Sequence, residues 1–376
     1  MMNKKGLYIH IPFCRKICSY CDFAKRVSND SIIEKYFDCL LKEFDFYLKK
    51  GFDYKQIKTI YIGGGTPSCI NKNLLSKLFQ KINSLVDLNE IIEYNFEINP
   101  EDLNYELIDL LASYNVTRVS IGIQTLNENL LKLLNRGFDL TKFIDNLKYL
   151  KNKIKHVNLD LMYAIPNQTI KDLEDTIEII KTFDVDHLSI YSLILEEKTI
   201  FNHWLLNDKI ELVNEEIELE MVDIIHKLLF PTFEKYEVSN FSKKGCESKH
   251  NLLYWENEEY LGLGLSAAGY LEDLRYVNTS NLKEYFSLIE EGKFPIEELE
   301  QLELIDEKKY HIILGLRLVK GIDVLKYQER FSSNIFDDFP KIMEFINQGY
   351  IGYQDNKIFI DSNYFYIMNH LLEQII

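Results

Sequence analysis

Apolar and polar positions follow two periods along the first half of the chain. Runs of apolar, β-branched residues, typical of buried strands, occupy residues 6–11, 58–62, 94–98, 118–123, 156–162 and 187–193. Segments with the apolar spacing of helices lie between them, at residues 31–50, 72–86, 101–114, 141–151 and 169–183. This alternation predicts an α/β fold with a parallel sheet and right-handed crossovers. Because six units are fewer than the eight of a closed barrel, we expect a partial (βα)6 barrel, open on one side to admit a large substrate.

The second half of the chain follows a different pattern. Residues 211–229 predict a long helix and residues 236–241 a strand, whereas residues 246–270 predict irregular structure. Helices are expected again at 281–291 and 306–320, and residues 340–375 read as helix, hairpin and helix. We expect three parts: the partial barrel (1–240), a connecting region (241–300) and a smaller, mainly helical C-terminal domain (301–376). The last part is either winged-helix-like or a plain helical cap over the barrel.

Charge and composition narrow the classes of function. The 59 acidic and 43 basic residues give a net charge of −16, which disfavours a non-specific grip on nucleic acid. No apolar run approaches the length of a membrane span, and the N-terminal residues do not resemble a signal peptide. We therefore expect a cytoplasmic protein without stable membrane insertion, whose thiols stay reduced. Three single cysteines are predicted to be small buried apolar residues rather than ligands, namely Cys39, Cys69 and Cys246.

Three other cysteines follow the first predicted strand closely. Cys14, Cys18 and Cys21 have the spacing C-x3-C-x2-C, which suits three corners of a four-iron cluster and leaves one iron open to bind a ligand. A structural zinc site with His10 as fourth ligand is an alternative, although zinc cysteines usually come as two separated pairs. A disulfide is disfavoured by the odd count and the reducing compartment.

Polar or glycine-rich clusters lie near the end of five of the six predicted strands or just after it. They are residues 14–21, residues 63–67, Glu97 with Asn99, Gln124, and Asp160. In parallel α/β folds ligands gather at the carboxyl ends of the strands, so we expect these clusters to share one rim. The run Gly-Gly-Gly-Thr-Pro at 63–67 exposes backbone groups but lacks the spacing of a phosphate loop. It suits a small zwitterion, such as an amino acid that chelates the open iron.

The cysteine triplet and the glycine run together resemble the radical S-adenosylmethionine (SAM) superfamily. In that superfamily SAM chelates the open iron of a [4Fe-4S] cluster and is cleaved by an electron from it, while the protein positions and shields the cofactor. The resemblance narrows to the oxygen-independent coproporphyrinogen III oxidase family over nearly the whole chain. The matching segments are YIHIPFC at 8–14, EINP at 97–100, RVSIGIQ at 118–124, DLMY at 160–163, PNQT at 166–169 and YEVSNF at 236–241.

The resemblance implies which residues contact SAM. Tyr8 would lie near the cofactor, and Gly64, Gly65 and Thr66 would meet its methionyl amine. The other implied SAM contacts are Glu97, Gln124, Arg136, Asp160 and, on the adenine side, Ala268 in the segment GLGLSAAG at 262–269. Relatives commonly carry a histidine two residues after Arg136, where this chain has Phe138, so any role of that histidine is absent or moved.

Two departures from the oxidases resemble the HemW branch, whose members are haem chaperones. The oxidases have a further cysteine two positions after the third cluster cysteine, where this chain has Phe23. They also have an extension before the first strand, for which this chain leaves no room because that strand begins by Leu7.

The segment His-Asn-Leu-Leu-Tyr-Trp at 250–255 matches a motif of that branch that is associated with haem. The resemblance implies that His250 ligates haem iron and that Tyr254 and Trp255 offer flat apolar surface to the macrocycle. The nearby lysines are candidates for the propionates, or are simply solvated: Lys243, Lys244 and Lys249.

The sequence thus predicts a protein that binds haem as cargo and transfers it to an acceptor protein, and that carries a [4Fe-4S] cluster and SAM. The alternative is a coproporphyrinogen III oxidase, a radical SAM oxidative decarboxylase, which Phe23 and the missing extension disfavour. RNA modification is a third class, disfavoured by the acidic balance. We assign no catalytic residue. The acceptor, the mode of haem attachment and the oligomeric state, for which a homo-oligomer is one option, stay open.

Overall fold

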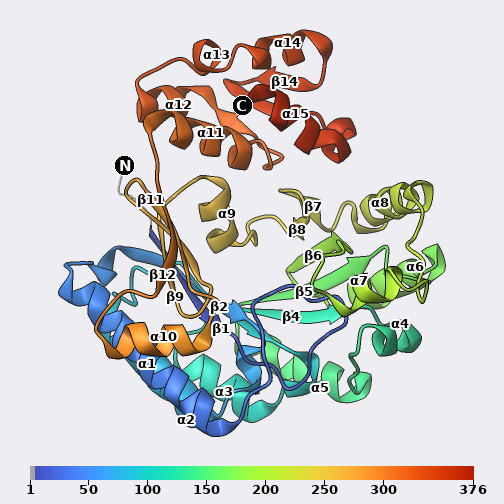
Figure 1. The fold of residues 1–376 in the computed structure, drawn as a ribbon. Helices are drawn as coiled ribbons and strands as arrows, with labels where there is room; N and C mark the ends of the chain where they lie inside the picture. The colour runs from blue at the N-terminus through green and yellow to red at the C-terminus, as the bar shows by residue number, and fades with distance from the viewer. Residues whose placement is uncertain (1–4) are drawn as a thin grey trace.

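A twelve-stranded sheet forms the larger part of the computed structural model, which describes residues 5–376 (Figure 1). Six parallel strands lie side by side in chain order. They are β1 (Lys5–Ile11), β2 (Ile57–Gly64), β3 (Glu93–Ile98), β4 (Arg118–Gln124), β5 (His156–Tyr163) and β6 (His187–Ser192). The predicted parallel sheet is therefore confirmed.

Helices that alternate with these strands bury one apolar face against the sheet. They are α1 (Asp30–Lys49), α2 (Lys72–Leu85), α3 (Tyr105–Ser113), α4 (Glu128–Leu133), α5 (Leu140–Lys151) and α6 (Ile170–Lys181), with the short turns η1 (Tyr54–Gln56), η2 (Pro67–Cys69) and η3 (Pro100–Asp102). Each α-helix begins at an Asn, Asp or Thr whose side chain accepts a hydrogen bond from a backbone N–H of the first turn. Most of their buried apolar residues and those of the strands form one continuous core, whereas Leu130 of α4 and Met162 of β5 belong to a smaller separate cluster.

Further strands extend both edges of the sheet. On the β1 side, β9 (Tyr260–Leu263) is parallel to β1 and is followed by antiparallel β10 (Ala268–Leu271), β11 (Leu274–Asn278) and β12 (Ile296–Gln301). On the β6 side lie β8 (Asn240–Ser242) and β7 (Glu234–Lys235). The strand order runs from β12 to β7 without closure, so the barrel is partial, as predicted.

The helices of the second half are α7 (Ile200–Leu205), α8 (Glu215–Leu229), α9 (Lys249–Trp255) and α10 (Leu282–Glu290). The expectation of irregular structure over residues 246–270 is wrong, because α9, β9 and β10 lie there. Strand β9 is buried on both faces and carries two of its four residues as Gly and Tyr, so it has no alternating pattern to detect. The strand expected at 236–241 is confirmed only at its end, because residues 240 and 241 belong to β8, whereas residues 236–239 connect β7 to β8.

The end of the chain has an apolar core of its own. Its elements are α11 (Leu304–Gly315), β13 (Ile322–Asp323), α12 (Val324–Phe331), α13 (Ile335–Asp338), α14 (Lys341–Gln348), β14 (Ile351–Gln354), β15 (Lys357–Ile360), η4 (Ser362–Ile367) and α15 (Met368–Ile375). The predicted order of helix, hairpin and helix is confirmed, and β13 joins the hairpin in a three-stranded sheet. The exact domain boundaries stay a prediction.

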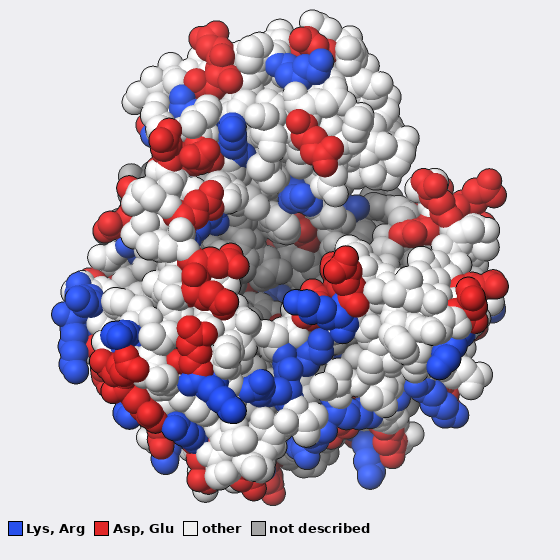
Figure 2. All heavy atoms as spheres, viewed as in Figure 1, with Lys and Arg blue, Asp and Glu red and all other residues white. Residues whose placement is uncertain are grey.

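The face seen in Figure 2 is hollowed between the C-terminal elements and the sheet, and Lys and Arg side chains gather along its lower rim. Among residues 5–376, no helix is both long and apolar enough to cross a membrane.

Candidate cofactor site

The loop between β1 and α1 carries the cysteine triplet and crosses in front of the sheet (dark blue, Figure 1). The backbone N–H of Cys14 donates to the carbonyl of Arg26 (2.9 Å), and that of Ser19 donates to the carbonyl of Leu134 (3.1 Å). The loop is therefore fixed both to itself and to the end of α4. All three cysteines, Cys14, Cys18 and Cys21, are half-buried thiols without a disulfide.

The surroundings of the Cys14 thiol disfavour a free thiolate. Burial raises its pKa to about 11, while a hydrogen bond from Thr66 Oγ1 (3.4 Å) lowers it. The charges of Cys21 and Cys18 raise it further, so the three sulfurs are close enough to repel one another as thiolates. Such a group of thiols needs a bound cation to be stable in its ionised form.

His10 does not supply a fourth ligand. It lies in β1, as expected, and is 5% exposed. Its Nδ1 is hydrogen-bonded to the hydroxyl of Tyr8 and its Nε2 to the carbonyl of Ala24, both at 2.8 Å. With both ring nitrogens engaged, the donor set of the loop is three thiols, which fits a four-iron cluster with one open iron better than a four-ligand zinc site.

The glycine run after β2 packs directly under this loop. Gly64 has φ +114°, and a Cβ there would lie 2.6 Å from the imidazole of His10. A Cβ on Gly65 would lie 2.8 Å from the carbonyl oxygen of Phe13. The run is therefore glycine both for its backbone conformation and for its contact with the cysteine loop.

Glu97 joins the glycine run to the neighbouring strand. Its Oε2 accepts from the backbone N–H of Gly64 (3.0 Å) and its Oε1 from the hydroxyl of Tyr61 (2.6 Å). Burial raises the pKa of the Glu97 carboxyl to about 7, with a contribution from the charge of Asp160. This carboxyl can therefore accept from an amine beside the glycine run and can change its protonation near neutral pH.

Arg136 connects the third strand to the cysteine loop. Its guanidinium donates to Oδ1 of Asn99 (2.5 Å) and to the hydroxyl of Tyr20 (2.9 Å). A Cβ on Gly122 would lie 3.3 Å from Arg136 and 2.9 Å from the amide nitrogen of Gln124, so these groups are neighbours. The residues predicted from the ends of β3 and β4 therefore converge on one rim.

The remaining predicted SAM contacts complete that rim. Gln124 has φ +70° and accepts from the hydroxyl of Tyr191 (2.8 Å), and Asp160 accepts from the amide of Asn158 (2.7 Å). Burial raises the pKa of Asp160. Ala268 begins β10 opposite Gly262, which is itself level with Tyr8 in the sheet. Their positions are compatible with one site, and their contact with SAM stays a prediction.

The segment at 250–255 lies away from this rim and is helical, which corrects the expectation of irregular structure around His250. His250 is in α9 and fully buried, and burial lowers its pKa to about 4. Its Nδ1 is hydrogen-bonded to Thr59 Oγ1 and its Nε2 to the hydroxyl of Tyr254, both at 2.8 Å. Neither ring nitrogen is free for haem iron in this conformation. Thr59 lies near the start of β2, so α9 covers the amino ends of the strands, opposite the cysteine loop.

A buried ion pair, which sequence reasoning missed, holds α9 in that position. Arg118 and Glu93 are both 2% exposed and lie 2.8 Å apart. Glu93 also accepts from the hydroxyl of Ser248 (3.1 Å) and from the backbone N–H groups of Lys249 (3.0 Å) and His250 (2.9 Å). A carboxylate at a helix N-terminus is electrostatically favourable. The available signal was a charged residue at the first position of each of these two strands.

The single cysteines, the lysine candidates and Phe138 lie in different surroundings. Cys39 is buried as predicted, whereas the expectation for Cys69 and Cys246 is wrong, because both are only half-buried. The lysine candidates are engaged in part: Lys243 pairs with Asp184 and Lys249 with Glu247. Phe138 packs edge-on against Phe143, a plain packing role.

Comparison with known proteins agrees with this geometry. Profiles of the Radical SAM superfamily and of the HemN C-terminal domain match residues 8–180 and 302–361. The chain is 35% identical to "Heme chaperone HemW" of Bacillus subtilis over 90% of each chain. It is also 35% identical to "Heme chaperone HemW" of Lactococcus lactis over 100% of this chain and 98% of that one.

The solved structure of coproporphyrinogen III oxidase (HemN) from Escherichia coli superposes with a TM-score of 0.85, over 100% of this chain and 91% of that chain. At 20% identity this likeness shows the fold alone. The identity to the two bacterial relatives extends over nearly the whole length. The chain therefore belongs to the HemW family of the radical SAM superfamily.

Proposed function

We propose that the chain binds haem and transfers it to an acceptor protein, and that it carries a [4Fe-4S] cluster that binds SAM. The supporting observation is the 35% identity to two proteins named haem chaperones over 90% or more of the chain. Phe23 supports the choice over the oxidase, because its 70% exposed side chain adds an apolar surface where the oxidases have a cysteine. The acceptor is a protein whose identity the chain does not specify. A cytoplasmic compartment belongs to the proposal, because the cluster thiols must stay reduced.

In this proposal the three loop cysteines hold the cluster, and the glycine run, Glu97, Gln124, Arg136, Asp160, Tyr8 and Ala268 line the SAM site. When bound, the cluster supplies an electron and an open iron to SAM. The chain's own groups orient these partners. Thr66 donates to the sulfur of Cys14, and hydrogen bonds to ligand sulfurs tune a cluster. Glu97, held by Tyr61 and Gly64, has further lone pairs for the amine of SAM.

The cysteine loop also offers a surface that suits haem. Three large apolar side chains of the loop are exposed: Ile17 (37%), Phe23 (70%) and Val27 (58%). Exposed apolar side chains on one functional loop are typical of a binding surface. A haem has a flat apolar face and two anionic propionates. The Lys and Arg side chains along the hollow in Figure 2 carry the opposite charge to these propionates. We therefore propose that haem contacts this loop.

His250 and Tyr254 are proposed haem contacts only after a rearrangement. To reach iron, the imidazole must give up its hydrogen bonds to Thr59 and Tyr254. Each bond contributes about 1 kcal/mol net, and the partners left unsatisfied in a buried site add to the cost. Haem ligation by His250 therefore requires α9 to open, which would expose its amides to hydrogen exchange.

Haem titration of the anaerobically reconstituted protein, followed by absorption, tests the proposal. We expect one haem per chain, and weaker binding for Phe23→Ser than for wild type. The matched control is Phe230→Ser, which changes a phenylalanine that is equally exposed (73%) beyond the end of α8. Equal affinities of the two variants would remove Phe23 from the haem surface. An unchanged spectrum for His250→Ala would remove His250 as a ligand.

The oxidase alternative is decided in the same preparation. Turnover of coproporphyrinogen III with SAM and a reductant, or the absence of any saturable haem binding, would overturn the proposal. Cys18→Ala serves as the cluster-free control, because two cysteines are a poor anchor for four irons. Its iron content should fall to the background level.

A further inference from the structure

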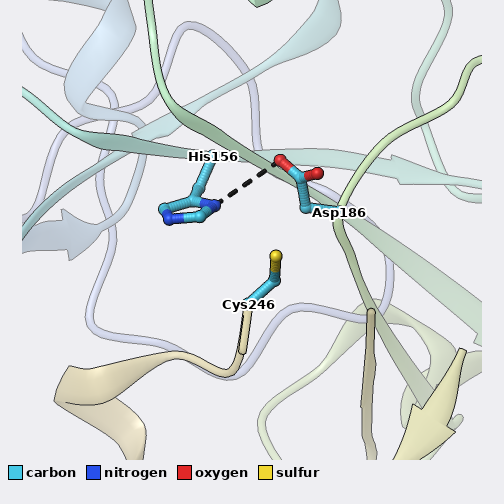
Figure 3. Close-up of side chains that lie close together, drawn as sticks. All are labelled: His156, Asp186 and Cys246. Carbon is cyan, nitrogen blue, oxygen red and sulfur yellow. Dashed lines mark ion pairs between the residues drawn. The ribbon is translucent and has the colours of Figure 1, made fainter. Parts of the chain in front are cut away.

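A second group of metal-ligand side chains lies far from the cysteine loop along the strands. His156 is the first residue of β5, Asp186 directly precedes β6, and Cys246 follows β8. A ring nitrogen of His156, a carboxylate oxygen of Asp186 and the Sγ of Cys246 all lie within 4.8 Å of one another. Figure 3 shows the three side chains turned toward a common centre. Because they start β5 and β6, they lie at the amino ends of the strands, opposite the proposed SAM rim.

The contact between His156 and Asp186 is too long for a hydrogen bond. The Nδ1 of His156 lies 3.6 Å from Oδ2 of Asp186, and this buried nitrogen has no hydrogen-bond partner. Two ligands of a tetrahedral zinc ion, bound at 2.0–2.3 Å, are separated by roughly 3.3–3.8 Å. The observed spacing therefore matches two ligands of one ion better than a direct bond between the side chains.

The backbone holds all three residues in position independently. The N–H of His156 donates to the carbonyl of Thr117 (3.0 Å), and that of Asp186 donates to the carbonyl of Val157 (3.3 Å). Cys246 follows a turn that is closed onto Lys243 (3.0 Å), and its carbonyl accepts from Arg118 (2.8 Å). An ion would therefore meet ligands that are already arranged, which lowers the cost of binding.

Within residues 5–376, no lysine or arginine forms a direct ion pair with Asp186. The ammonium groups of Lys243 and Lys151 both pair with Asp184, and the charge of Lys243 acts on Asp186 only at longer range. The side chains of His156 and Asp186 are 17% and 28% exposed, and Cys246 is half-buried. Ions and water can therefore reach the group from one side.

We propose that His156, Asp186 and Cys246 bind a zinc ion, with water as the fourth ligand. One nitrogen, one oxygen and one sulfur suit Zn²⁺, whereas Mg²⁺ and Ca²⁺ require oxygen ligands throughout. Binding at neutral pH releases the thiol proton of Cys246 to solvent, since the bound form is the thiolate. The ion would fasten the segment that leads into α9 to the starts of β5 and β6, beside the ion pair of Glu93 and Arg118.

The test is zinc binding to the full-length, cluster-loaded protein. After treatment with a chelator and readdition of Zn²⁺, we expect one zinc per chain by elemental analysis and a higher Tm. Cys246→Ser and His156→Gln should weaken zinc binding at least ~100-fold, more than loss of an outer contact usually does. The matched control, Cys39→Ala, removes a buried cysteine and should bind zinc as wild type does.

The cluster cysteines also attract zinc, so a second measurement isolates the new site. In full-length protein with Cys14, Cys18 and Cys21 all changed to Ala, Co²⁺ should give a sulfur-to-cobalt absorption band. That band should disappear in the same background with Cys246→Ser. Asp186→Asn, which keeps size and shape, covers the case in which another variant fails to fold. Equal zinc affinity with and without Cys246, or no zinc at all, would overturn the proposal.

Discussion

Replacing Glu43 by Gln should change how the stability of this protein depends on pH. Glu43 lies in α1 and is fully buried. Its carboxyl accepts from the N–H of Gly264 (2.9 Å), the amide of Asn278 (2.9 Å) and the hydroxyl of Tyr285 (2.6 Å). It therefore joins the segment after β9 to the helix that follows the cysteine loop. None of these three donors to the Glu43 carboxyl is a cation.

Burial raises the pKa of the Glu43 carboxyl from 4.5 to about 7, although the three hydrogen bonds lower it in part. Below pH 4.5 the group is protonated in both folded and unfolded chains and gives no pH dependence. As the pH rises toward 7, the unfolded chain loses this proton while the folded chain keeps it, so stability falls by about 1.4 kcal/mol per pH unit. Between pH 5.5 and 8.5, wild type should lose about 2 kcal/mol from this group.

Gln cannot ionise, so Glu43→Gln should not show this loss. If the glutamine amide lowers the free energy of unfolding by a fixed amount, that amount is the same at every pH. The change in the free energy of unfolding with pH therefore reports the ionisation of Glu43 alone. Urea unfolding of the cluster-free protein at pH 5.5 and 8.5 measures the change, with Glu34→Gln, an exposed site on the same helix, as control. A difference between Glu43→Gln and wild type that varies by less than about 0.5 kcal/mol over this range would refute the reasoning.

Three further substitutions test the rim and the helix at the opposite end. Glu97→Gln should weaken SAM binding in equilibrium dialysis roughly 10–100-fold, because a hydrogen bond to a charged group contributes ~1.5–3 kcal/mol; unchanged binding would exclude the carboxylate as a contact. Gly64→Ala should also impair SAM binding, since its Cβ would lie 2.6 Å from His10 at φ +114°; wild-type affinity would show that the loop adapts. Arg118→Met leaves Glu93 buried without its cation and should cost about 3–5 kcal/mol in urea unfolding; a loss below 1 kcal/mol would contradict this.

Local signals were sufficient to predict the parallel strands and the rim. Each βα unit combines a buried apolar run, a capped helix and a turn, so its pattern is readable without the rest of the chain. Ligand sites of parallel sheets lie at the carboxyl ends of the strands, and neighbouring parallel strands end at the same edge. These two facts were sufficient to predict that the glycine run, Glu97 and Gln124 lie together. The contacts among them, such as Glu97 with Gly64, follow from adjacent strands in the same register.

Contacts between distant segments were not predictable in the same way. Glu93 and Ser248 are hydrogen-bonded across 155 positions, and Glu43 and Tyr285 across 242. The periodicity of a local segment does not indicate such pairs. A glutamate is predicted to be exposed unless the groups that donate hydrogen bonds to it are known. The burial of His250 in α9 was missed for the same reason. The resemblance implied a ligand role for His250, but nothing local in the sequence indicated its hydrogen bond with Thr59.

The two ends of the barrel are joined through Tyr61. Its ring centroid lies 5.3 Å from that of His250, and its hydroxyl donates to Glu97, which in turn holds the glycine run. A change at His250 can therefore reach the cofactor rim without any haem beside α9. Loss of haem binding in His250→Ala would not by itself identify an iron ligand. Tyr61→Phe keeps the ring but removes the hydroxyl, so it should reproduce that loss if α9 acts through the rim, and should leave haem binding intact if the imidazole binds iron.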